Sequence, residues 1–360
     1  MKVLHIINSL STGGAEKLVA DSIPLYQTQK ITVDVLSLKS EKTEFWKLLE
    51  TKSSNNITGL TSGSIYNPFL ILKIIPFLKK YDLIHVHLFP ALYWVVIAKC
   101  MSFSRVKLIY TEHSTGNRRR DKVLFKIIDR FIYKKIDLIV CITSDVKVNL
   151  EKHLNVFKGL VVINNGIDVN AFSSSLQGDY LFFKPEDFKL IQISSFRKEK
   201  DQASIIRSLS LLPEQIKLIL VGDGILIEEH KKLVSSLKLD DRVVFLGNRY
   251  DITELLNYAD VAVLSSNREG FGLAIVEGMA AGLPVIASDI VGIREIVKDY
   301  GLLFEKNNED DLKQEILKLY DDKEFYKKMS FLSLERAKDF DINKMVLHYM
   351  NFYKKLLNEA

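Results

Sequence analysis

The segment SSNREGFGLAIVEGMAAGLPVIAS, residues 265–288, contains a turn whose residues suit the binding of an anion. Gly270 and Gly272 let the backbone approach a bound group where a side chain would intrude. An apolar helical pattern begins near Gly272, so the unpaired N–H groups and the positive dipole end of that helix face the space above the turn. This arrangement favours a ligand that carries phosphate.

Two glutamates bracket the start of this helix. Glu269 precedes it, and Glu277 lies eight positions later. If the whole interval were helical, its rise would separate the two residues by roughly 12 Å. That is about the span from a sugar to a ribose across a diphosphate, so we expect the loop to hold a nucleotide-sugar.

Further candidate residues follow other strand patterns in the second half of the chain. In SSFRKEKDQ, Arg197 and Lys200 can reach one phosphate, the arginine as a bidentate fork and the lysine as a point charge. Two such side chains can neutralise a diphosphate without Mg²⁺, so we expect no metal and no cofactor; a solvated surface pair is the alternative. The turns VGDG and LGNRYD are expected to frame the nucleotide base, with Asn248 and Arg249 nearest it.

The first half of the chain offers two candidates of the same kind. Gly14 follows the first strand pattern in SLSTGGAE, where G-x-G-x-x-G is absent, so NAD and FAD are disfavoured. His113 lies in TEHS directly after an apolar strand pattern. Ligands of parallel sheets bind beyond the carboxyl ends of the strands. A ligand role for His113 and a purely structural role both remain open.

The elements that must position these residues alternate between strand and helix. Continuous apolar strands separated by helices predict parallel sheets covered on both faces. A linker rich in Asn, Ser, Gly and Asp follows residue 164, and residues 310–360 are predicted to be helical throughout. The strands are predicted at residues 2–8, 31–38, 83–87, 106–111, 138–142 and 160–163, and then at 189–194, 217–221, 243–246, 261–264, 284–287 and 302–304.

Composition and charge narrow the class of protein. The 360 residues are 47% hydrophobic and 26% charged, with two cysteines, which indicates globular domains in a reducing compartment. Residues 1–168 carry 24 Lys and Arg against 14 Asp and Glu, whereas the remainder has 26 against 31. The basic half indicates an anionic partner. We expect a cytoplasmic protein.

Basic residues recur along one predicted helix. Lys122, Lys126, Arg130 and Lys134 form a stripe at a spacing of four, and Arg118–Arg120 precede it. A solvated helix and a helix that lies on anionic lipid are both compatible with this pattern. Nucleic acid is disfavoured, because no aromatic stacking platform accompanies the charge. The apolar residues of the segment, on another face, are Leu124, Ile127, Ile128 and Phe131.

The ordered motifs resemble the retaining glycosyltransferases of family four, which have the GT-B architecture. EGFGLAIVE is similar to the E-x7-E element of that family. Ser194–Phe196 stand where many members carry Gly-Arg-Leu, and FRKEKD is similar to a variant of that region. The other landmarks, in the family's order over about 300 residues, are GGAE, DLIHVH, TEH, NNGID, VGDG, FLGNR and AAGLPVIASD.

The resemblance implies a role for each matched residue. Glu269 holds sugar hydroxyls near the anomeric carbon, and Glu277 binds the ribose. Arg197 and Lys200 bind the diphosphate. The remaining implied contacts come from the amides of Phe271, Gly272 and Leu273 to the sugar and diphosphate, from Gly14 to the diphosphate or acceptor, and from His113 to the transferred sugar.

The resemblance also implies the fold and the reaction. It implies an α/β protein with two Rossmann-like domains whose parallel sheets face a cleft: an acceptor domain over 1–168, a donor domain over 169–340, and a helix over 341–360 that crosses back. The implied reaction is retaining transfer from a nucleotide-sugar, UDP favoured over GDP, to a saccharide or polyprenyl-diphosphate-linked acceptor in bacterial surface glycan synthesis. The hypothesis includes peripheral association with the inner face of the cell membrane. The alternatives are a catalytically silent donor-binding subunit and a nucleotide-sugar epimerase.

Overall fold

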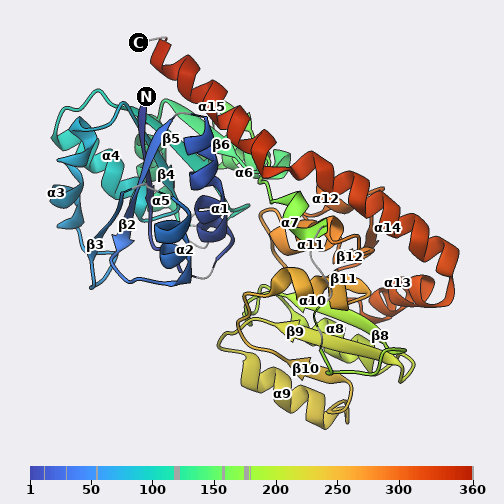
Figure 1. Ribbon diagram of the computed structural model, residues 1–360. Helices are drawn as coiled ribbons and strands as arrows, with labels where there is room; N and C mark the ends of the chain where they lie inside the picture. Colours follow the sequence, from blue (N-terminus) through green and yellow to red (C-terminus); the bar gives the residue numbers. More distant parts are fainter. Residues whose placement is uncertain are drawn as a thin grey trace. The chain divides into compact units, whose positions relative to one another are not determined.

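The computed structural model describes residues 1–11, 13–29, 31–53, 56–116, 122–155, 159–173, 178 and 180–358. The chain divides into two compact units, each with its own parallel sheet and helices (Figure 1). Unit 1 comprises Met1–Gly166 and Ile342–Ala360, and unit 2 comprises Ile167–Asp341. The last helix therefore belongs to the unit formed by the N-terminal part of the chain, as the resemblance implied.

Unit 1 is built on a seven-stranded sheet in which all neighbouring strands run parallel. The order β3-β2-β1-β4-β5-β6-β7 places β1 and β4 at the centre. Their near-continuous apolar sequences suit strands buried on both faces. The strands are β1 (Lys2–Ile7), β2 (Thr32–Lys39), β3 (Ile57–Thr61), β4 (Leu83–His87), β5 (Lys107–Glu112), β6 (Leu138–Cys141) and β7 (Leu160–Val162).

The helices of unit 1 form two groups of neighbours. In one group α1 (Gly14–Thr28) contacts both α2 (Glu44–Lys52) and α15 (Ile342–Asn358). In the other group each helix contacts the next along the chain. The second group consists of α3 (Leu70–Ile74), α4 (Ala91–Met101), α5 (Val123–Tyr133) and α6 (Ser144–Leu154), and a short 3-10 helix η1 (Phe77–Lys79) follows α3.

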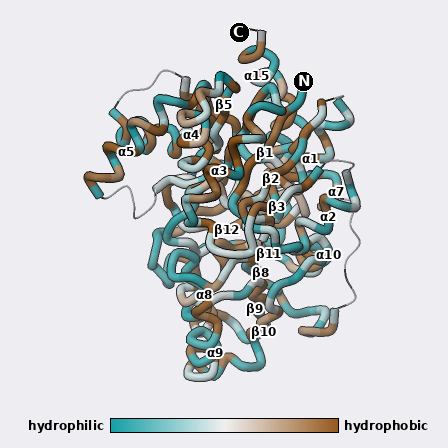
Figure 2. The backbone as a smooth tube through the Cα atoms, turned by 90° about the vertical axis from the view of Figure 1, so that its left-hand side faces the viewer, coloured by the Kyte–Doolittle hydropathy of each residue, from teal (hydrophilic) through white to brown (hydrophobic). Residues whose placement is uncertain are grey.

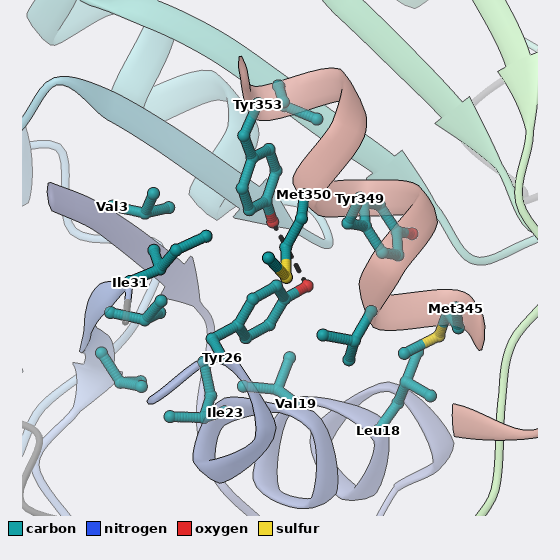
Figure 3. Close-up of a cluster of buried hydrophobic side chains, with 14 of the residues drawn as sticks. Val3, Leu18, Val19, Ile23, Tyr26, Ile31, Met345, Tyr349, Met350 and Tyr353 are labelled. Carbon is teal, nitrogen blue, oxygen red and sulfur yellow. Dashed lines mark hydrogen bonds between the residues drawn. The ribbon is translucent and has the colours of Figure 1, made fainter. Parts of the chain in front are cut away.

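The last helix is held to unit 1 by a buried apolar interface with α1 and the sheet. Leu18, Val19 and Ile23 of α1 lie opposite Met345 and Met350 of α15 (Figure 3). Tyr26 and Tyr353 are both buried, and their hydroxyl oxygens lie 3.4 Å apart. Each fully buried side chain of this size contributes roughly 1.5–3 kcal/mol relative to exposure. Burial of several such side chains explains why a segment from the far end of the chain completes this core.

Unit 2 has a six-stranded parallel sheet in the order β10-β9-β8-β11-β12-β13. The strands β8 and β11 are neighbours at its centre, so the turns that follow them lie at the same edge. The strands are β8 (Phe188–Ile193), β9 (Ile216–Val221), β10 (Val243–Phe245), β11 (Val261–Leu264), β12 (Val285–Ser288) and β13 (Leu302–Phe304). The helices are α7 (Val169–Ser173), α8 (Gln202–Leu209), α9 (Ile227–Ser236), α10 (Ile252–Tyr258), α11 (Leu273–Ala280), α12 (Arg294–Val297), α13 (Glu309–Asp321) and α14 (Lys323–Ala337), followed by the 3-10 helix η2 (Lys338–Phe340).

The prediction of an α/β protein with two parallel-sheet domains is confirmed, and the structure corrects two local expectations. The edge strand β3 was not predicted, because its sequence ITGLT lacks a long apolar run and is only partly buried. The helical prediction for residues 310–360 is confirmed, with α13, α14 and α15 as separate helices. Asp322 caps α14, accepting hydrogen bonds from the backbone N–H groups of Glu324 and Phe325. The apolar pattern of residues 68–80 favours one continuous helix, but the structure has α3 and η1 there, separated at Pro76, which cannot donate a backbone hydrogen bond. Among the described helices none combines the length and apolar character that a bilayer span requires.

Candidate functional site

The turns that follow the central strands of unit 2 bring a lysine and a glutamate into contact. Lys200 lies between β8 and α8, and its Nζ forms an ion pair with Glu269, which lies between β11 and α11. Ser266 Oγ also donates to the Glu269 carboxylate, at 3.0 Å. The side chains of Lys200 and Glu269 are 25% and 11% exposed, so the pair is partly withdrawn from solvent yet open to a ligand. The structure thus brings together two residues that are 69 positions apart in sequence.

The turn that carries Lys200 is fixed by hydrogen bonds to the neighbouring strand end. Gln192 Nε2 donates to the carbonyl of Lys200 at 3.1 Å. Ser265 Oγ lies 2.7 Å from the carbonyl oxygen of Asp201, and the backbone N–H of Asn267 donates to Glu199 at 2.8 Å. Because both turns share these bonds, the position of Lys200 relative to Glu269 is set by the sheet and not by flexible side chains alone.

Helix α11 begins where the sequence placed it, and its first amides are unbonded. Gly272 is the cap, with a φ of +77°, and a Cβ there would lie 2.4 Å from Ile293 Cδ1. Among the described residues no acceptor is bonded to the backbone N–H groups of Phe271, Gly272 and Leu273. The Phe271 side chain is buried and packs edge-on against Phe340. The backbone at this point therefore offers a row of donors at the positive end of a helix dipole, which is a typical anion site.

Gly292 supports the loop that carries Glu269. It has a φ of +89°, and a Cβ built there would lie 2.6 Å from the carbonyl oxygen of Glu269 and 3.1 Å from that of Gly270. Only glycine allows the turn after β12 to approach this closely. Gly292 thus acts on the Glu269 loop through its backbone.

Glu277 lies within α11 and is only 4% exposed. The estimate of roughly 12 Å between the two glutamates assumed helical rise over the whole interval. It does not apply, because α11 starts at Leu273 and Glu269 lies outside the helix. The structure does show a partly exposed carboxylate before the helix, that of Glu269, and a buried one inside it, that of Glu277.

The remaining predicted residues of unit 2 are not drawn into this cluster. Arg197 is exposed, and its side chain forms no hydrogen bond or ion pair with the described residues. Asn248 is exposed as well. Arg249 donates through Nε to Asp251 at 2.8 Å and also forms an ion pair with that carboxylate. This pairing holds the pKa of Asp251 well below its usual range. The arginine fork is thus already engaged by a neighbouring side chain.

Unit 1 contains a cavity of about 290 Å³ at the carboxyl end of its sheet. His113 lines it, directly after β5, as the sequence predicted. Gly14 is exposed at the first position of α1, which follows β1 in the same sheet. The sequence did not single out Asn8, whose amide donates to the carbonyl of Phe89 at 2.7 Å and accepts from the N–H of Ala91 at 3.1 Å. The full lining is Asn8, Leu88, Phe89, Tyr110, Glu112, His113 and Ser114.

Three buried histidines lie behind this cavity, and the sequence reading did not assign them a role. His85 and His87 alternate along β4, and His5 on β1 is in register with His85. Their spacing was a usable signal, because residues i and i+2 of a strand share a face. One ligand atom from each ring lies within 4.8 Å of the others, a distance compatible with a metal. All six ring nitrogens, however, lie within hydrogen-bond distance of protein partners, so we interpret the cluster as a hydrogen-bond network.

Helix α5 leaves several of its apolar side chains exposed, whereas Ile132 and Tyr133 are buried. The buried face contains Asp129, which lies 2.9 Å from His153 Nε2 and also accepts from Tyr93. Val123, Leu124, Ile127 and Phe131 are between 54% and 76% exposed. Figure 2 shows hydrophobic segments along this helix. Of the expected basic residues, Lys122 and Lys134 are exposed and Lys126 and Arg130 are half-buried, whereas Arg118–Arg120 lie outside the described residues.

Two known protein families match the chain. Residues 12–171 match the family described as Glycosyltransferase Family 4. Residues 180–331 match the family described as Glycosyl transferases group 1. Together the two matches cover most of both units and every candidate residue discussed above except His5 and Asn8.

Relatives with assigned activities align over much of the chain. N-acetyl-alpha-D-glucosaminyl L-malate synthase of Bacillus anthracis is 29% identical over 78% of this chain and 76% of its own length. N-acetylgalactosamine-N,N'-diacetylbacillosaminyl-diphospho-undecaprenol 4-alpha-N-acetylgalactosaminyltransferase of Campylobacter jejuni is 27% identical over 93% of this chain and 94% of its own. UDP-Gal:alpha-D-GlcNAc-diphosphoundecaprenol alpha-1,3-galactosyltransferase of Escherichia coli is 29% identical over 68% of each chain.

A solved structure shows the same fold. HepE of Anabaena, crystallised with UDP and glucose, aligns with a TM-score of 0.87 over 99% of this chain and 100% of its own, at 23% identity.

Proposed function

Because the chain belongs to the GT-B glycosyltransferases of family four, we propose that it moves a sugar from a nucleotide-sugar, with a UDP-sugar favoured, to a lipid-linked saccharide. The observation that carries the donor assignment is the Lys200–Glu269 pair beside the unbonded amides of Phe271–Leu273. Two relatives are named for acceptors linked to diphospho-undecaprenol, which supports the same acceptor class here. The proposal places the reaction in bacterial surface glycan synthesis.

Different residues of unit 2 contact different parts of the nucleotide-sugar in the proposed donor site. The amides at the start of α11 and the Lys200 ammonium meet the diphosphate, since both supply positive charge. Glu269 accepts hydrogen bonds from hydroxyls of the transferred sugar, and the buried Glu277 carboxylate accepts those of the ribose. The exposed Arg197 side chain can turn toward the same diphosphate. Asn248 contacts the base, whereas Arg249 must leave Asp251 to do so.

The reaction proceeds with retention and without a bound metal. The bond from the anomeric carbon to the diphosphate oxygen breaks, and the acceptor oxygen forms its bond on the same face of the sugar. The departing phosphate oxygen takes the acceptor proton, so no side-chain base is required. Lys200 and the helix amides stabilise the charge that develops on the leaving diphosphate, which is where preorganised donors contribute most.

The donor assignment predicts a selective thermal stabilisation. UDP-, GDP- and dTDP-sugars are added separately, and the midpoint of unfolding is measured. A ligand that binds only the folded protein stabilises it by about 2.7 kcal/mol at one hundred times its dissociation constant. We expect the largest upward shift with UDP-sugars, and a flat response to all three classes contradicts the donor site.

Catalysis is tested on the same protein with a donor that shifts its midpoint. Transfer to a polyprenyl-diphosphate-linked saccharide supports the transferase assignment. Binding with neither transfer nor hydrolysis indicates the silent-subunit alternative, and interconversion of the donor sugar without an acceptor indicates the epimerase alternative.

The acceptor class also accounts for the outward apolar face of α5. A lipid-linked acceptor lies in a membrane, and an exposed apolar stripe bordered by lysine and arginine suits the surface of anionic lipid. Residues 99–135 carry 11 basic and 3 acidic residues, which adds long-range attraction to such a surface. We therefore assign α5 as the helix through which the enzyme associates peripherally with the membrane.

Replacing Ile127 with aspartate is expected to lower sedimentation with anionic liposomes about tenfold. Ile127 is 61% exposed, so the change removes a lipid contact without disturbing the core. A loss of about 1.4 kcal/mol in binding free energy corresponds to a tenfold weaker association with the liposomes. The matched control is Phe331→Asp, which changes an apolar residue of α14 that is 62% exposed. Equal sedimentation of the wild type with neutral and anionic vesicles, or an equal loss in the control, contradicts the assignment.

A further inference from the structure

A continuous hydrogen-bonded network connects the C-terminal helix to the cavity of unit 1. Its contacts run from Tyr349 on α15 through Thr111 on β5, His85 on β4, Tyr353 on α15, His5 on β1 and His87 on β4 to His113. The successive polar atoms lie 3.0, 2.7, 2.6, 3.2, 3.0 and 3.1 Å apart. All members except His113 are buried. None of them except His113 takes part in the proposed donor or acceptor contacts.

The imidazoles of this network are neutral at physiological pH. Burial lowers the pKa of His5 to about 3 and that of His113 to about 4. Burial also places the pKa values of His85 and His87 well below the usual range. A neutral imidazole has one N–H donor and one acceptor nitrogen. In each histidine of the network, one ring nitrogen therefore accepts a hydrogen bond from one neighbour and the other donates to the next neighbour.

The Tyr349 end determines that direction. Among the described residues, the Tyr349 hydroxyl has Thr111 Oγ1 as its one hydrogen-bond partner. Burial raises the pKa of Tyr349, so its hydroxyl proton stays in place. If Thr111 donated to Tyr349, the buried hydroxyl proton of Tyr349 would have no acceptor, which would cost about 1–3 kcal/mol. Tyr349 therefore donates to Thr111, and Thr111 donates to His85 Nε2.

The remaining bonds follow from this start. His85 donates from Nδ1 to the Tyr353 oxygen, and Tyr353 donates to His5 Nε2. The Tyr26 hydroxyl, 3.4 Å from that of Tyr353, has no second hydrogen-bond partner among the described residues, so it donates to Tyr353 and forms a side branch. His5 donates from Nδ1 to His87 Nε2, and His87 donates from Nδ1 to His113 Nε2. The one proton of His113 is then on Nδ1, which has no partner among the described residues.

We propose that this relay holds His113 as the Nδ1–H tautomer, so that it serves as a hydrogen-bond donor to an oxygen of the transferred sugar and not as a base. The inference rests on the proposed function for the identity of the ligand oxygen. Tyr353 is then a positioning residue: it acts on the sugar through His5, His87 and His113. The relay also gives the C-terminal helix a role in the reaction besides closing the core of unit 1.

The test compares two tyrosine variants by NMR and kinetics. In protein labelled with ¹⁵N-histidine, long-range ¹H–¹⁵N correlations show which nitrogen of each neutral ring carries the proton, and the spectrum of His113→Gln assigns the His113 signals. We expect Nδ1–H for His113 in the wild type. Tyr353→Phe removes the donor to His5, so a mixture of His113 tautomers is expected, with a fall in kcat of about tenfold and a donor KM within about twofold.

Tyr26→Phe is the matched control, because it removes a buried hydroxyl from the same interface and leaves the relay continuous. It is expected to retain the wild-type tautomer and kcat. Nε2–H on His113 in the wild type, or an unchanged tautomer in Tyr353→Phe, overturns the relay. The NMR result does not require turnover: the expected tautomers in a protein without transferase activity uphold the relay and refute the proposed function.

Discussion

Lys200→Ala is expected to lower kcat about 10²–10³-fold while the donor KM changes less than about fivefold. Removing one preorganised donor to a developing negative charge typically has an effect of this size. Lys200 contacts Glu269, so its ammonium lies where the sugar and the leaving diphosphate of the proposed donor meet. The charge on the diphosphate increases as the glycosidic bond breaks, so the lysine stabilises the transition state more than the bound donor. Initial rates over a range of donor concentrations measure both constants.

Lys198→Ala is the matched control for this change. Lys198 is exposed on the same turn, two residues away, and its side chain forms no hydrogen bond or ion pair with the described residues. The control is expected to keep kcat within about twofold, because an exposed charge is screened by solvent. Unchanged turnover in Lys200→Ala contradicts the assignment, and so does an equal loss in Lys198→Ala.

Acidification from pH 7 to pH 5 is expected to reduce the unfolding free energy of unit 1 by about 4 kcal/mol from His5 and His113 alone. Their folded pKa values, about 3 and about 4, lie below the unfolded value near 6.5. The unfolded chain therefore takes up protons in this window while the folded chain does not, and stability falls as the pH falls. The pKa values of His85 and His87 are shifted in the same direction, so these two residues add to the loss.

Tryptophan fluorescence during urea unfolding measures this effect in unit 1. Both tryptophans of the chain, Trp46 and Trp94, belong to that unit. His5→Gln is expected to reduce the loss between pH 7 and pH 5, and His348→Gln, which changes an exposed residue of α15, is expected to leave it unchanged. A stability that is level from pH 7 to pH 5 contradicts the neutral, buried state of the cluster.

The sequence by itself was sufficient for the fold class, the principal strands and the glycine turn before α11. The apolar strands β4, β11 and β13 were predicted with the bounds observed, because near-continuous apolar runs between helical patterns leave few alternatives. The helix was predicted to start near Gly272, and the structure adds a local reason for glycine there, because its φ is +77°. Local chemistry and periodicity were enough for these features.

Other features depended on which strands became neighbours. Lys200 and Glu269 meet because β8 pairs with β11, a pairing that neither segment encodes locally. The exposure of the apolar face of α5 could not be predicted from the sequence for a similar reason. The periodicity gives the apolar positions of a helix, but only packing decides that Asp129 is buried and Ile127 is exposed.

The histidine relay shows this division most clearly. The alternation of His85 and His87 is visible in the sequence and places them on one face of a strand. Their partners His5, Thr111 and Tyr353 come from two other strands and the last helix. Side-chain hydrogen bonds act over about 3 Å, so they form only after the sheet order and the return of α15 have been established. The sequence determined the residues available for chemistry, and the tertiary structure decided which of them act together.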